Sequence, residues 1–270
     1  MTIENIVLNP EKVEGTEKIN EAYLPPEERS EEFKQLLEAK YNSLLGEENL
    51  DELEEDFIIR RYLHHFQLKD DDLKNKTILD VGCGLGAFIK YCSDKNITPE
   101  AYGFDLELNS QLAEGKYKNH LVKGDFTKEI PFQDKKFDYI LAYSSLESLF
   151  LEENNEEAKR VFESLLFLLK DEGEIRVYPL RKLPPEIAPE EVKQDKEKME
   201  ELLQAKEARE RWEKTLQELK EEGLIDFKIQ PIDIRVLSAK KDFWLEELLI
   251  ISKHDQPLKR GKIYIENGYV

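Results

Sequence analysis

The sequence is poor in cysteine, methionine and glycine. Its 270 residues include 2 Cys, 2 Met and 12 Gly. Cys83 and Cys92 are too few for a disulfide framework or for a cysteine-based metal site, so we expect no bound metal. Free cysteines without a disulfide pattern fit a reducing, cytoplasmic setting.

Long hydrophobic runs are also missing. No stretch approaches the roughly 18 apolar residues that indicate a membrane-spanning helix. The first ten residues, MTIENIVLNP, lack the basic and the apolar segments of a signal peptide. We therefore predict a cytoplasmic protein that neither crosses nor binds a membrane.

Positive charge is scarce, because 40 Lys and Arg residues stand against 59 Asp and Glu residues, a formal net charge of −19. A protein that grips phosphate backbones needs a cationic surface, so we expect no general nucleic-acid binding. The expected partner is a small-molecule or protein substrate. The composition does not indicate the oligomeric state.

Hydrophobic residues make up 40% of the chain, enough to fill a core beneath a heavily charged surface. From Lys76 onward, short β-rich runs alternate with helical segments, which is typical of a parallel sheet with crossover helices. We expect strands at 77–81, 101–104, 121–123, 137–143 and 174–178, and helices at about 86–95, 108–116 and 155–170. Two further strands, within 227–237 and 243–253, are predicted as antiparallel neighbours at the sheet edge.

Helical spacing of apolar residues predicts further helices outside this core, at about 30–45, 49–67 and 188–222. We divide the chain into an N-terminal arm with cap helices (1–70), a domain (71–253) with a helical insertion or lid (183–222), and a C-terminal tail (254–270). We expect the cap helices and the insertion, with Trp212, to close a pocket over the C-terminal edge of the sheet. The alternative is that they pack on the flanks of the sheet.

The most informative motif is ILDVGCGLGAF, residues 78–88. An apolar strand ends in Asp80 and runs into Gly82, Gly84 and Gly86. Glycines let the backbone turn sharply and let a ligand approach without meeting a Cβ atom. The free N–H groups of the following helix favour a carboxylate or phosphate. With Ala87 the run also satisfies the G-x-G-x-x-A pattern of dinucleotide sites, so an NAD site is one alternative.

The string D-x-G-x-G-x-G resembles motif I of class I (Rossmann-like) S-adenosylmethionine-dependent methyltransferases with a methyltransferase type 11-like core. The segments YGFDLE, KGDFTKEIPF, FDYILAYSSLESL and LLKDEGEIRVYPL resemble later segments of that family in the same order. In the last of them, Asp171 and Glu172 replace the usual Pro and Gly. The resemblance covers about residues 76–180 and leaves 1–60 and 183–222 without a motif.

This resemblance implies a doubly wound α/β fold. Its seven-stranded sheet would be mostly parallel with an antiparallel last strand, and N-terminal helices and a helical insertion after strand five would be added to it. It implies S-adenosylmethionine as the cofactor, with Asp105 accepting hydrogen bonds from the ribose, Asp125 accepting from the adenine amino group, and the Phe126 N–H serving the ring. The residues assigned to the cofactor site are Asp80, Gly82, Cys83, Gly84, Gly86, Asp105, Leu106, Asp125, Phe126 and Tyr143.

Several of these residues also have a purely structural interpretation. Asp80 can fix the turn from strand to loop, Asp105 can be a solvated strand end, and Asp125 can be an ordinary turn residue. Cys83 is expected to be a small packing residue rather than a nucleophile. The neighbouring residues 64 and 65, both histidine, are expected to serve surface or core packing.

The implied reaction is methyl transfer from a sulfonium to an O, N or C nucleophile of a small molecule or protein. Alignment and desolvation supply much of the rate of such a reaction, so a conspicuous acid or base is not required. We name no catalytic residue. Glu147 is a candidate substrate contact, with a solvated helix start as the alternative. The alternatives for the chain are a non-catalytic S-adenosylmethionine-binding module acting through a partner and an NAD(P)-dependent oxidoreductase.

Overall fold

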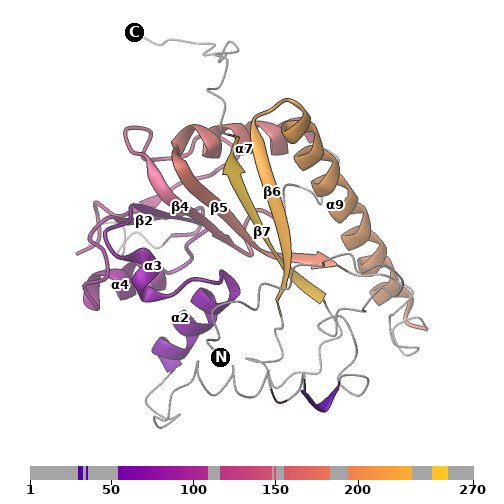
Figure 1. Cartoon of the computed structure of the whole chain (residues 1–270), viewed down its shortest axis with the longest axis horizontal. Coiled ribbons are helices and arrows are strands. Elements are labelled where there is room, and N and C mark those ends of the chain that lie inside the picture. Colours follow the sequence, from indigo (N-terminus) through magenta and orange to yellow (C-terminus); the bar gives the residue numbers. More distant parts are fainter. Residues whose placement is uncertain are drawn as a thin grey trace.

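The computed structural model describes residues 30–32, 35, 54–108, 116–147, 149, 155–182, 194–232 and 245–254. Its seven strands form one sheet in the order β3-β2-β1-β4-β5-β7-β6 (Figure 1). The strands are β1 (Ile78–Val81), β2 (Ala101–Asp105), β3 (Leu121–Lys123), β4 (Phe137–Tyr143), β5 (Leu169–Lys182), β6 (Ile225–Ile232) and β7 (Leu245–Lys253). The first five are parallel, and β7 runs antiparallel to both β5 and β6. The predicted fold class, with its reversed last strand, is confirmed.

Helices cover both faces of the sheet. They are α2 (Glu54–His65), α3 (Asp70–Leu73), α4 (Ala87–Asp94), α7 (Asn155–Leu168) and α9 (Lys196–Glu221). The helix predicted at 108–116 and most of the one at 30–45 lie outside the described residues. One core cluster joins α7 and α9 to one face, and a second joins α2 and α4 to the other. In the described residues, no helix is long and apolar enough to span a membrane.

Strand β1 lies at the centre of the sheet because three of its four residues, Ile78, Leu79 and Val81, are apolar and suited to burial between two helical layers. Its side chains are buried throughout, including the carboxyl group of Asp80. Parallel strands with both faces covered have such continuous apolar runs. The short β1 therefore positions the glycine loop that follows it at the carboxyl edge of the sheet.

Strand β5 begins earlier than the sequence pattern predicts. The expected start was 174, with Gly173 ending the preceding helix, but β5 starts at Leu169 directly after α7. A Cβ atom on Gly173 would lie only 2.8 Å from the Phe137 carbonyl oxygen, so glycine permits close packing against β4. The pairing register between β4 and β5 shifts at this point, between Phe137 and Tyr139.

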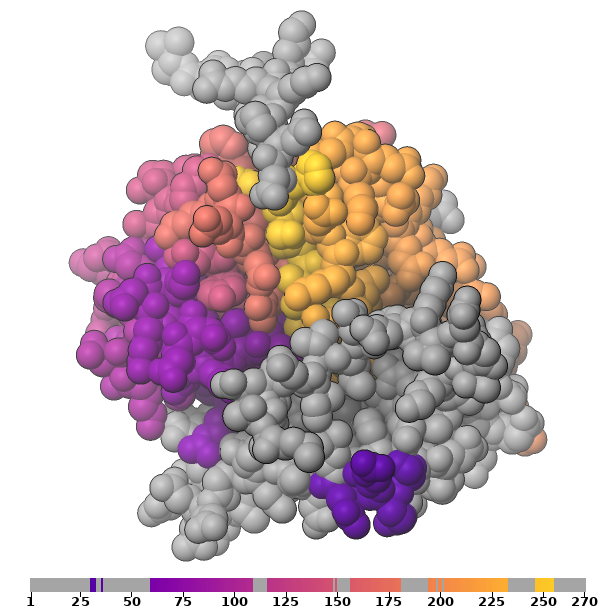
Figure 2. All heavy atoms as spheres, in the orientation of Figure 1, coloured from indigo at the N-terminus to yellow at the C-terminus, as the bar shows by residue number. Residues whose placement is uncertain are grey.

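Helix α9 lies on the flank of the sheet beside α7, where Trp212 meets Phe162 edge-on with ring centroids 5.1 Å apart. It also contacts β5 and β6 (Figure 1). The expectation that Trp212 lines a pocket is therefore wrong, because its ring completes the core instead. In the space-filling view, the surface of β7 (yellow) lies between residues 155–182 (salmon) and the surface of β6 and α9 (orange) (Figure 2). The insertion residues 183–193 lie outside the described residues.

Candidate functional site

The candidate site lies at the carboxyl ends of β1, β2 and β4. The strand order 3-2-1-4-5 reverses direction between β1 and β4. In open α/β sheets, ligands bind in the crevice outside the carboxyl ends of the strands at such a reversal. The sequence motif places the glycine loop directly after β1, so loop and crevice coincide.

The three glycines of the loop all adopt left-handed backbone angles, with φ of 74° at Gly82, 53° at Gly84 and 69° at Gly86. A Cβ atom at Gly82 would lie 2.3 Å from the Cβ atom of Ser145, and one at Gly86 would lie 2.7 Å from a methyl of Leu121. By contrast, a Cβ at Gly84 would meet nothing within 4 Å. Gly82 and Gly86 thus pack the loop against the protein, while the Gly84 backbone faces open space that a ligand can use.

Asp105 ends β2 and holds the glycine loop. One of its carboxylate oxygens accepts a hydrogen bond from the Gly84 N–H at 2.9 Å, and the other accepts one from the Glu107 N–H at 2.8 Å. A carboxylate offers more lone pairs than these two bonds use. The half-buried Asp105 therefore keeps acceptor capacity that suits two neighbouring hydroxyl groups, such as those of a ribose.

Asp80 has a different environment from Asp105, because it is only 2% exposed. Its carboxyl group accepts a hydrogen bond from the Tyr62 hydroxyl of α2 at 2.8 Å. Burial, together with the nearby charge of Asp105, raises the pKa of Asp80 to about 7, although the bond from Tyr62 acts in the opposite direction. Asp80 thus anchors the start of the loop to α2 through the Tyr62 hydroxyl, which agrees with the structural interpretation of this residue.

Cys83 acts as a packing residue of the loop. A Cβ atom at Gly103 would lie 2.9 Å from the Cys83 sulfur, so the thiol fills the space above that glycine of β2. Burial raises the pKa of the Cys83 thiol well above its ordinary range, with smaller contributions from Asp80 and Asp105. A thiol held in the neutral form is a poor nucleophile, which agrees with the packing interpretation.

Asp125 and Phe126 follow β3 at the same edge. One oxygen of Asp125 accepts hydrogen bonds from the Thr127 N–H at 3.0 Å and the Thr127 hydroxyl at 2.6 Å, and the other lies 3.1 Å from the Lys128 ammonium. These local bonds favour the turn interpretation of Asp125. The Phe126 ring packs against the core, and within the described residues its N–H donates to no group. The Phe126 N–H is therefore available to a ring nitrogen of adenine, whereas both oxygens of Asp125 already have local partners and are less suited to the adenine amino group.

Two apolar side chains are exposed beside the loop. Leu85 is 71% exposed and Leu106 is 59% exposed. Leu85 follows Gly84 in the loop after β1, and Leu106 follows Asp105 at the end of β2, so the two side chains flank the Gly84–Asp105 hydrogen bond. Exposed apolar groups next to a polar cradle are typical of a surface that a partly apolar ligand covers.

Tyr143 ends β4, and its hydroxyl lies 2.9 Å from Nδ1 of His65 on α2. Its ring stacks on Tyr62 with centroids 5.3 Å apart, and His65 stacks on Tyr178 of β5 at 4.3 Å. The sequence placed Tyr62 in a helical stripe that could line a pocket and His65 in packing, without connecting either to Tyr143. No local signal could have done so, because α2 meets the strands only through tertiary contacts.

Glu147 follows β4 and is half-buried, with one carboxylate oxygen enclosed. That placement differs from a solvated helix start, the alternative given above. Among the described residues, no group of three or more His, Cys, Asp or Glu side chains could hold a metal ion. The site therefore consists of the glycine loop, Asp105, the Phe126 amide and the aromatic residues of α2 and β4.

This donor and acceptor set fits S-adenosylmethionine. The open backbone at Gly84 accommodates the amino-acid end, and the remaining lone pairs of Asp105 suit the two ribose hydroxyls. Leu106 and the Phe126 N–H suit an apolar ring that also accepts a hydrogen bond. The described residues thus leave room for the amino-acid end and offer groups suited to the ribose and the adenine.

Comparison with known proteins agrees with this geometry. Residues 79–177 match the family model described as a methyltransferase domain. No curated protein gives a significant sequence match.

Solved structures that resemble the chain include the plantazolicin methyltransferase BpumL in complex with a pentazolic desmethylPZN analogue and SAH. It is 18% identical, covers 83% of this chain and 100% of its own, and has a TM-score of 0.47. The plantazolicin methyltransferase BamL, in complex with a triazolic analogue and SAH, is 17% identical over 82% of this chain and 91% of its own, at 0.46. LepI in complex with SAM is 13% identical over 67% of this chain and 43% of its own, at 0.43.

The matched segment begins within β1 and ends within β5, so it spans the glycine loop, Asp105 and the ends of β3 and β4. The strand order, the reversed β7 and the loop geometry are those that the motif resemblance implies. Residues 79–177 are therefore similar to a methyltransferase domain, and this match favours S-adenosylmethionine over NAD as the cofactor of the glycine loop.

Proposed function

We propose that the chain transfers a methyl group to an O, N or C nucleophile of a small molecule. The observation that supports this most directly is the position of the half-exposed Tyr143, at the end of β4 beside the glycine loop and inside an aromatic cluster. An aromatic, partly enclosed surface suits an organic acceptor of modest size. The net charge of −19 argues against a nucleic-acid acceptor.

When bound, S-adenosylmethionine supplies the transferable methyl group and a neutral thioether leaving group. The residues of this chain bind and orient the cofactor and exclude water from the site. Asp105 holds the loop and would hold the ribose, while the Phe126 N–H and Leu106 would hold the adenine. The rings of Tyr62 and Tyr143 exclude water beside the loop. Fixed alignment and exclusion of water together supply a large part of the rate in such transfers.

The test combines cofactor affinity with the destination of the methyl group. Calorimetry should show S-adenosylhomocysteine binding and no comparable NAD binding. Asp105→Ala should weaken that binding by on the order of 1.5–3 kcal/mol, the scale of hydrogen bonds to a charged group. With radiolabelled S-adenosylmethionine and a cell extract separated by size, the label should enter the small-molecule fraction.

Other outcomes identify the alternatives. Label in the protein fraction would mean a protein acceptor. Cofactor binding without any transfer of label, in every fraction, would support a non-catalytic binding module that acts through a partner. A wild-type affinity that Asp105→Ala leaves unchanged would show that the ribose does not bind at Asp105.

A further inference from the structure

The carboxyl ends of β4 and β5 carry two tyrosines next to the glycine loop. Tyr143 and Tyr178 are directly paired in the register of the two strands. Just beyond Tyr143, the Ser145 hydroxyl donates to the Val81 carbonyl at 2.6 Å, and a Cβ atom at Gly82 would lie 2.3 Å from the Cβ atom of Ser145. The end of β4 is therefore packed directly against the loop, on the opposite side of β1 from β2.

His65 of α2 holds the Tyr143 phenol in place. Its Nδ1 lies 2.9 Å from the Tyr143 hydroxyl, and its ring stacks on Tyr178 with centroids 4.3 Å apart. Tyr178 is buried, and its hydroxyl donates to the Glu246 carboxylate of β7. Tyr143 itself is only half-buried, so, unlike His65 and Tyr178, it can still contact a ligand.

The backbone directly after Tyr143 is strained. Ser144 is exposed and adopts a left-handed conformation with φ of 50°, which residues other than glycine rarely adopt. Its N–H donates to the Tyr178 carbonyl at 2.7 Å, so the neighbouring strand holds it in this conformation. Strain of this kind is concentrated at active sites and ligand contacts. It marks the end of β4 as a surface that a ligand of the reaction contacts.

The protonation of the two side chains sets the direction of the His65–Tyr143 hydrogen bond. Burial lowers the pKa of His65 to about 3, with smaller contributions from His64 and Arg61, so its imidazole is neutral and has one N–H. Its Nε2 is enclosed and has no hydrogen-bond partner among the described residues, and a buried N–H without an acceptor is rare. The proton of His65 therefore resides on Nδ1, which donates to the Tyr143 oxygen. Burial also raises the pKa of Tyr143, so the phenol keeps its own proton and has it available for another group.

A hydroxyl donor at this place favours an oxygen nucleophile over an amine. An amine nitrogen has one lone pair, and a hydrogen bond from Tyr143 would occupy the pair that must attack the methyl group. A carboxylate or phenolate oxygen has further lone pairs, so it can accept from Tyr143 and attack at the same time. Neither Tyr143 nor His65 can take up a proton in this arrangement, so the oxygen has to arrive ionised. The sulfonium charge of the cofactor attracts such an anion.

We propose that Tyr143, oriented by His65, binds the nucleophilic oxygen of the methyl acceptor, and that this oxygen belongs to a carboxylate or phenolate of a small molecule. The proposal rests on the proposed methyl transfer and specifies its acceptor atom. The oxygen forms a bond to the methyl carbon as the carbon–sulfur bond breaks, and the electron pair of that bond stays on sulfur, which becomes a neutral thioether. No proton leaves, because the acceptor enters as an anion. His65 acts through Tyr143 and is a positioning residue.

The test identifies the atom that receives the methyl group and does not require the acceptor to be known. S-adenosylmethionine with an isotope-labelled methyl group is incubated with the full chain and the small-molecule fraction of a cell extract. A carbon–proton correlation spectrum distinguishes O-methyl from N-methyl and C-methyl groups, and we expect an O-methyl signal that depends on the protein. Alkaline hydrolysis then separates the two acceptor classes, because a methyl ester releases methanol and a methyl ether does not.

Variants of the pair and one matched control complete the test. Tyr143→Phe should lower formation of the O-methyl product about tenfold or more, the scale of a hydrogen bond to a charged group, and leave the affinity for S-adenosylhomocysteine unchanged. His65→Phe keeps a ring on Tyr178 without the donor and should lose most of this activity. His65→Asn retains an N–H near the Nδ1 position and should recover part of it. Tyr139→Phe changes another half-buried tyrosine of β4, away from the carboxyl end, and should alter neither product formation nor affinity.

An N-methyl or C-methyl signal in place of the O-methyl signal would overturn the proposal while methyl transfer itself stands. A loss of S-adenosylhomocysteine affinity in Tyr143→Phe would place this hydroxyl on the cofactor and would overturn it as well. If the protein bound S-adenosylhomocysteine but gave no methyl signal, the proposed transfer would fail, and the acceptor assignment with it. Nitrogen NMR of His65 checks the positioning role without reference to activity, because a proton on Nε2 would contradict it.

Discussion

At the scale of single residues, the two carboxyl groups next to the glycine loop have opposite environments. Asp105 is half-exposed and is bonded by two backbone N–H groups, whereas Asp80 is buried and faces only a neutral donor, Tyr62. Burial stabilises the protonated form of a carboxyl group. The difference makes Asp80 the residue from which we expect a measurable dependence of stability on pH.

The pKa of Asp80 is about 7 in the folded protein against 3.8 for an ordinary Asp. Between these values the unfolded state has released its proton while the folded state keeps it, so stability falls as pH rises. Asp80→Asn removes this effect. We expect its stability relative to wild type to rise from about pH 4 to pH 8, by on the order of 4 kcal/mol. Urea unfolding of both proteins at stepped pH measures the difference, and a flat difference curve would contradict the assignment.

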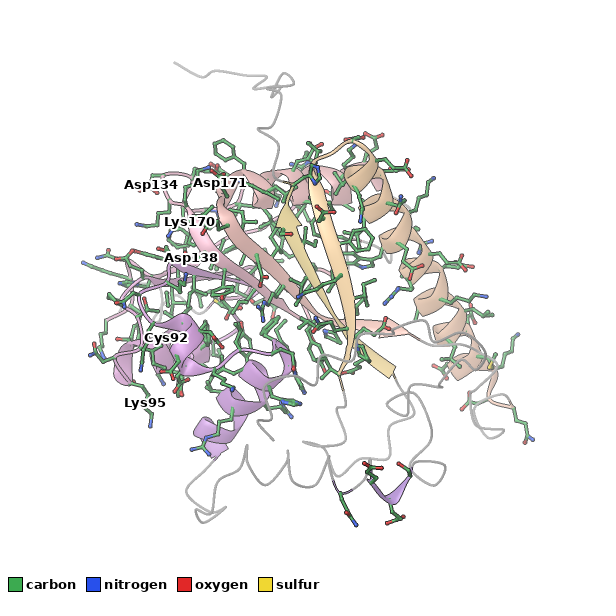
Figure 3. The ribbon with its side chains drawn as sticks, in the orientation of Figure 1. Cys92, Lys95, Asp134, Asp138, Lys170 and Asp171 are labelled. Carbon is green, nitrogen blue, oxygen red and sulfur yellow. The ribbon has the colours of Figure 1, made fainter. Side chains whose placement is uncertain are left out.

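Asp138 provides a control of opposite sign. It lies near Lys170 on the side of the sheet away from α2 (Figure 3). Although burial opposes its ionisation, hydrogen bonds from the Lys170 ammonium at 2.6 Å and the Thr77 N–H at 2.8 Å lower its pKa. The stabilisation is lost only as pH falls through that lowered pKa. The difference curve for Asp138→Asn should therefore be flat from pH 5 to 8, where that for Asp80→Asn changes.

The sequence located the glycine loop and Asp105 because these residues form one motif with fixed spacing along consecutive strands. It placed the cap helices near this edge but did not identify the individual contacts of α2, because these join distant positions of the chain. Tyr62 and Asp80 are 18 positions apart, and His65 and Tyr143 are 78 apart. Helical periodicity shows that a side chain is buried, but it does not show which strand end the side chain meets.

At the scale of elements, the same limit explains the position of α9. The apolar face of this helix has to be buried against another part of the protein. The sequence pattern is equally compatible with packing over the pocket as a lid and with packing on the flank of the sheet. The structure places Leu202, Trp212 and Leu216 in the core beside α7 and the edge strands. The strand boundaries were predicted well where strands are short and buried, whereas β5 extends through charged residues 170–172, which a hydrophobicity pattern does not include.

One buried ion pair connects α9 to the sheet, and it supports a prediction about stability. Arg209 Nη2 lies 2.7 Å from a carboxylate oxygen of Glu247 in β7, with side chains only 10% and 4% exposed. Removing one partner of a buried pair leaves an uncompensated charge and costs about 3–5 kcal/mol. We expect Glu247→Gln to lower the free energy of unfolding by up to about that amount, because Arg209 keeps a second, more exposed partner in Glu213 at 2.8 Å. The double variant Arg209→Met/Glu247→Leu should lose less, because no charge remains buried.

Urea unfolding measures both variants, and the exposed pair Lys214–Glu218 is the matched control within the same helix. Its side chains are 67% and 47% exposed at a separation of 3.9 Å. Exposed pairs contribute about 0–1 kcal/mol, so Glu218→Gln should change stability little. A loss for Glu247→Gln no larger than that for Glu218→Gln would show that the buried pair does not hold α9 in place.

At the scale of the whole molecule, topology and charge lead to different kinds of conclusion. Alternation of strands and helices along the chain determined the parallel sheet, and the reversed β7 came from the family resemblance. The direction of the parallel strands then shows which edge of the sheet binds the cofactor, because ligands bind at the carboxyl ends of the strands. The net charge of the chain does not indicate the fold, but it disfavours binding to negatively charged partners such as nucleic acids.

The acidic surface of the molecule should keep it from binding nucleic acids generally. With a net charge of −19, the chain repels a polyanion at long range, and short-range contacts must overcome that repulsion. Several basic side chains of the described surface are already paired with carboxylates, including Lys74, Lys116, Lys128 and Lys159. A filter-binding titration with duplex DNA and with RNA at moderate salt should show no affinity tighter than roughly 10⁻⁶ M, the range of ordinary non-specific binding. S-adenosylhomocysteine binding by the same sample establishes that the protein is folded. Tight binding with a steep salt dependence would reveal a basic surface within the acidic average, and it would return a nucleic acid to the set of possible methyl acceptors.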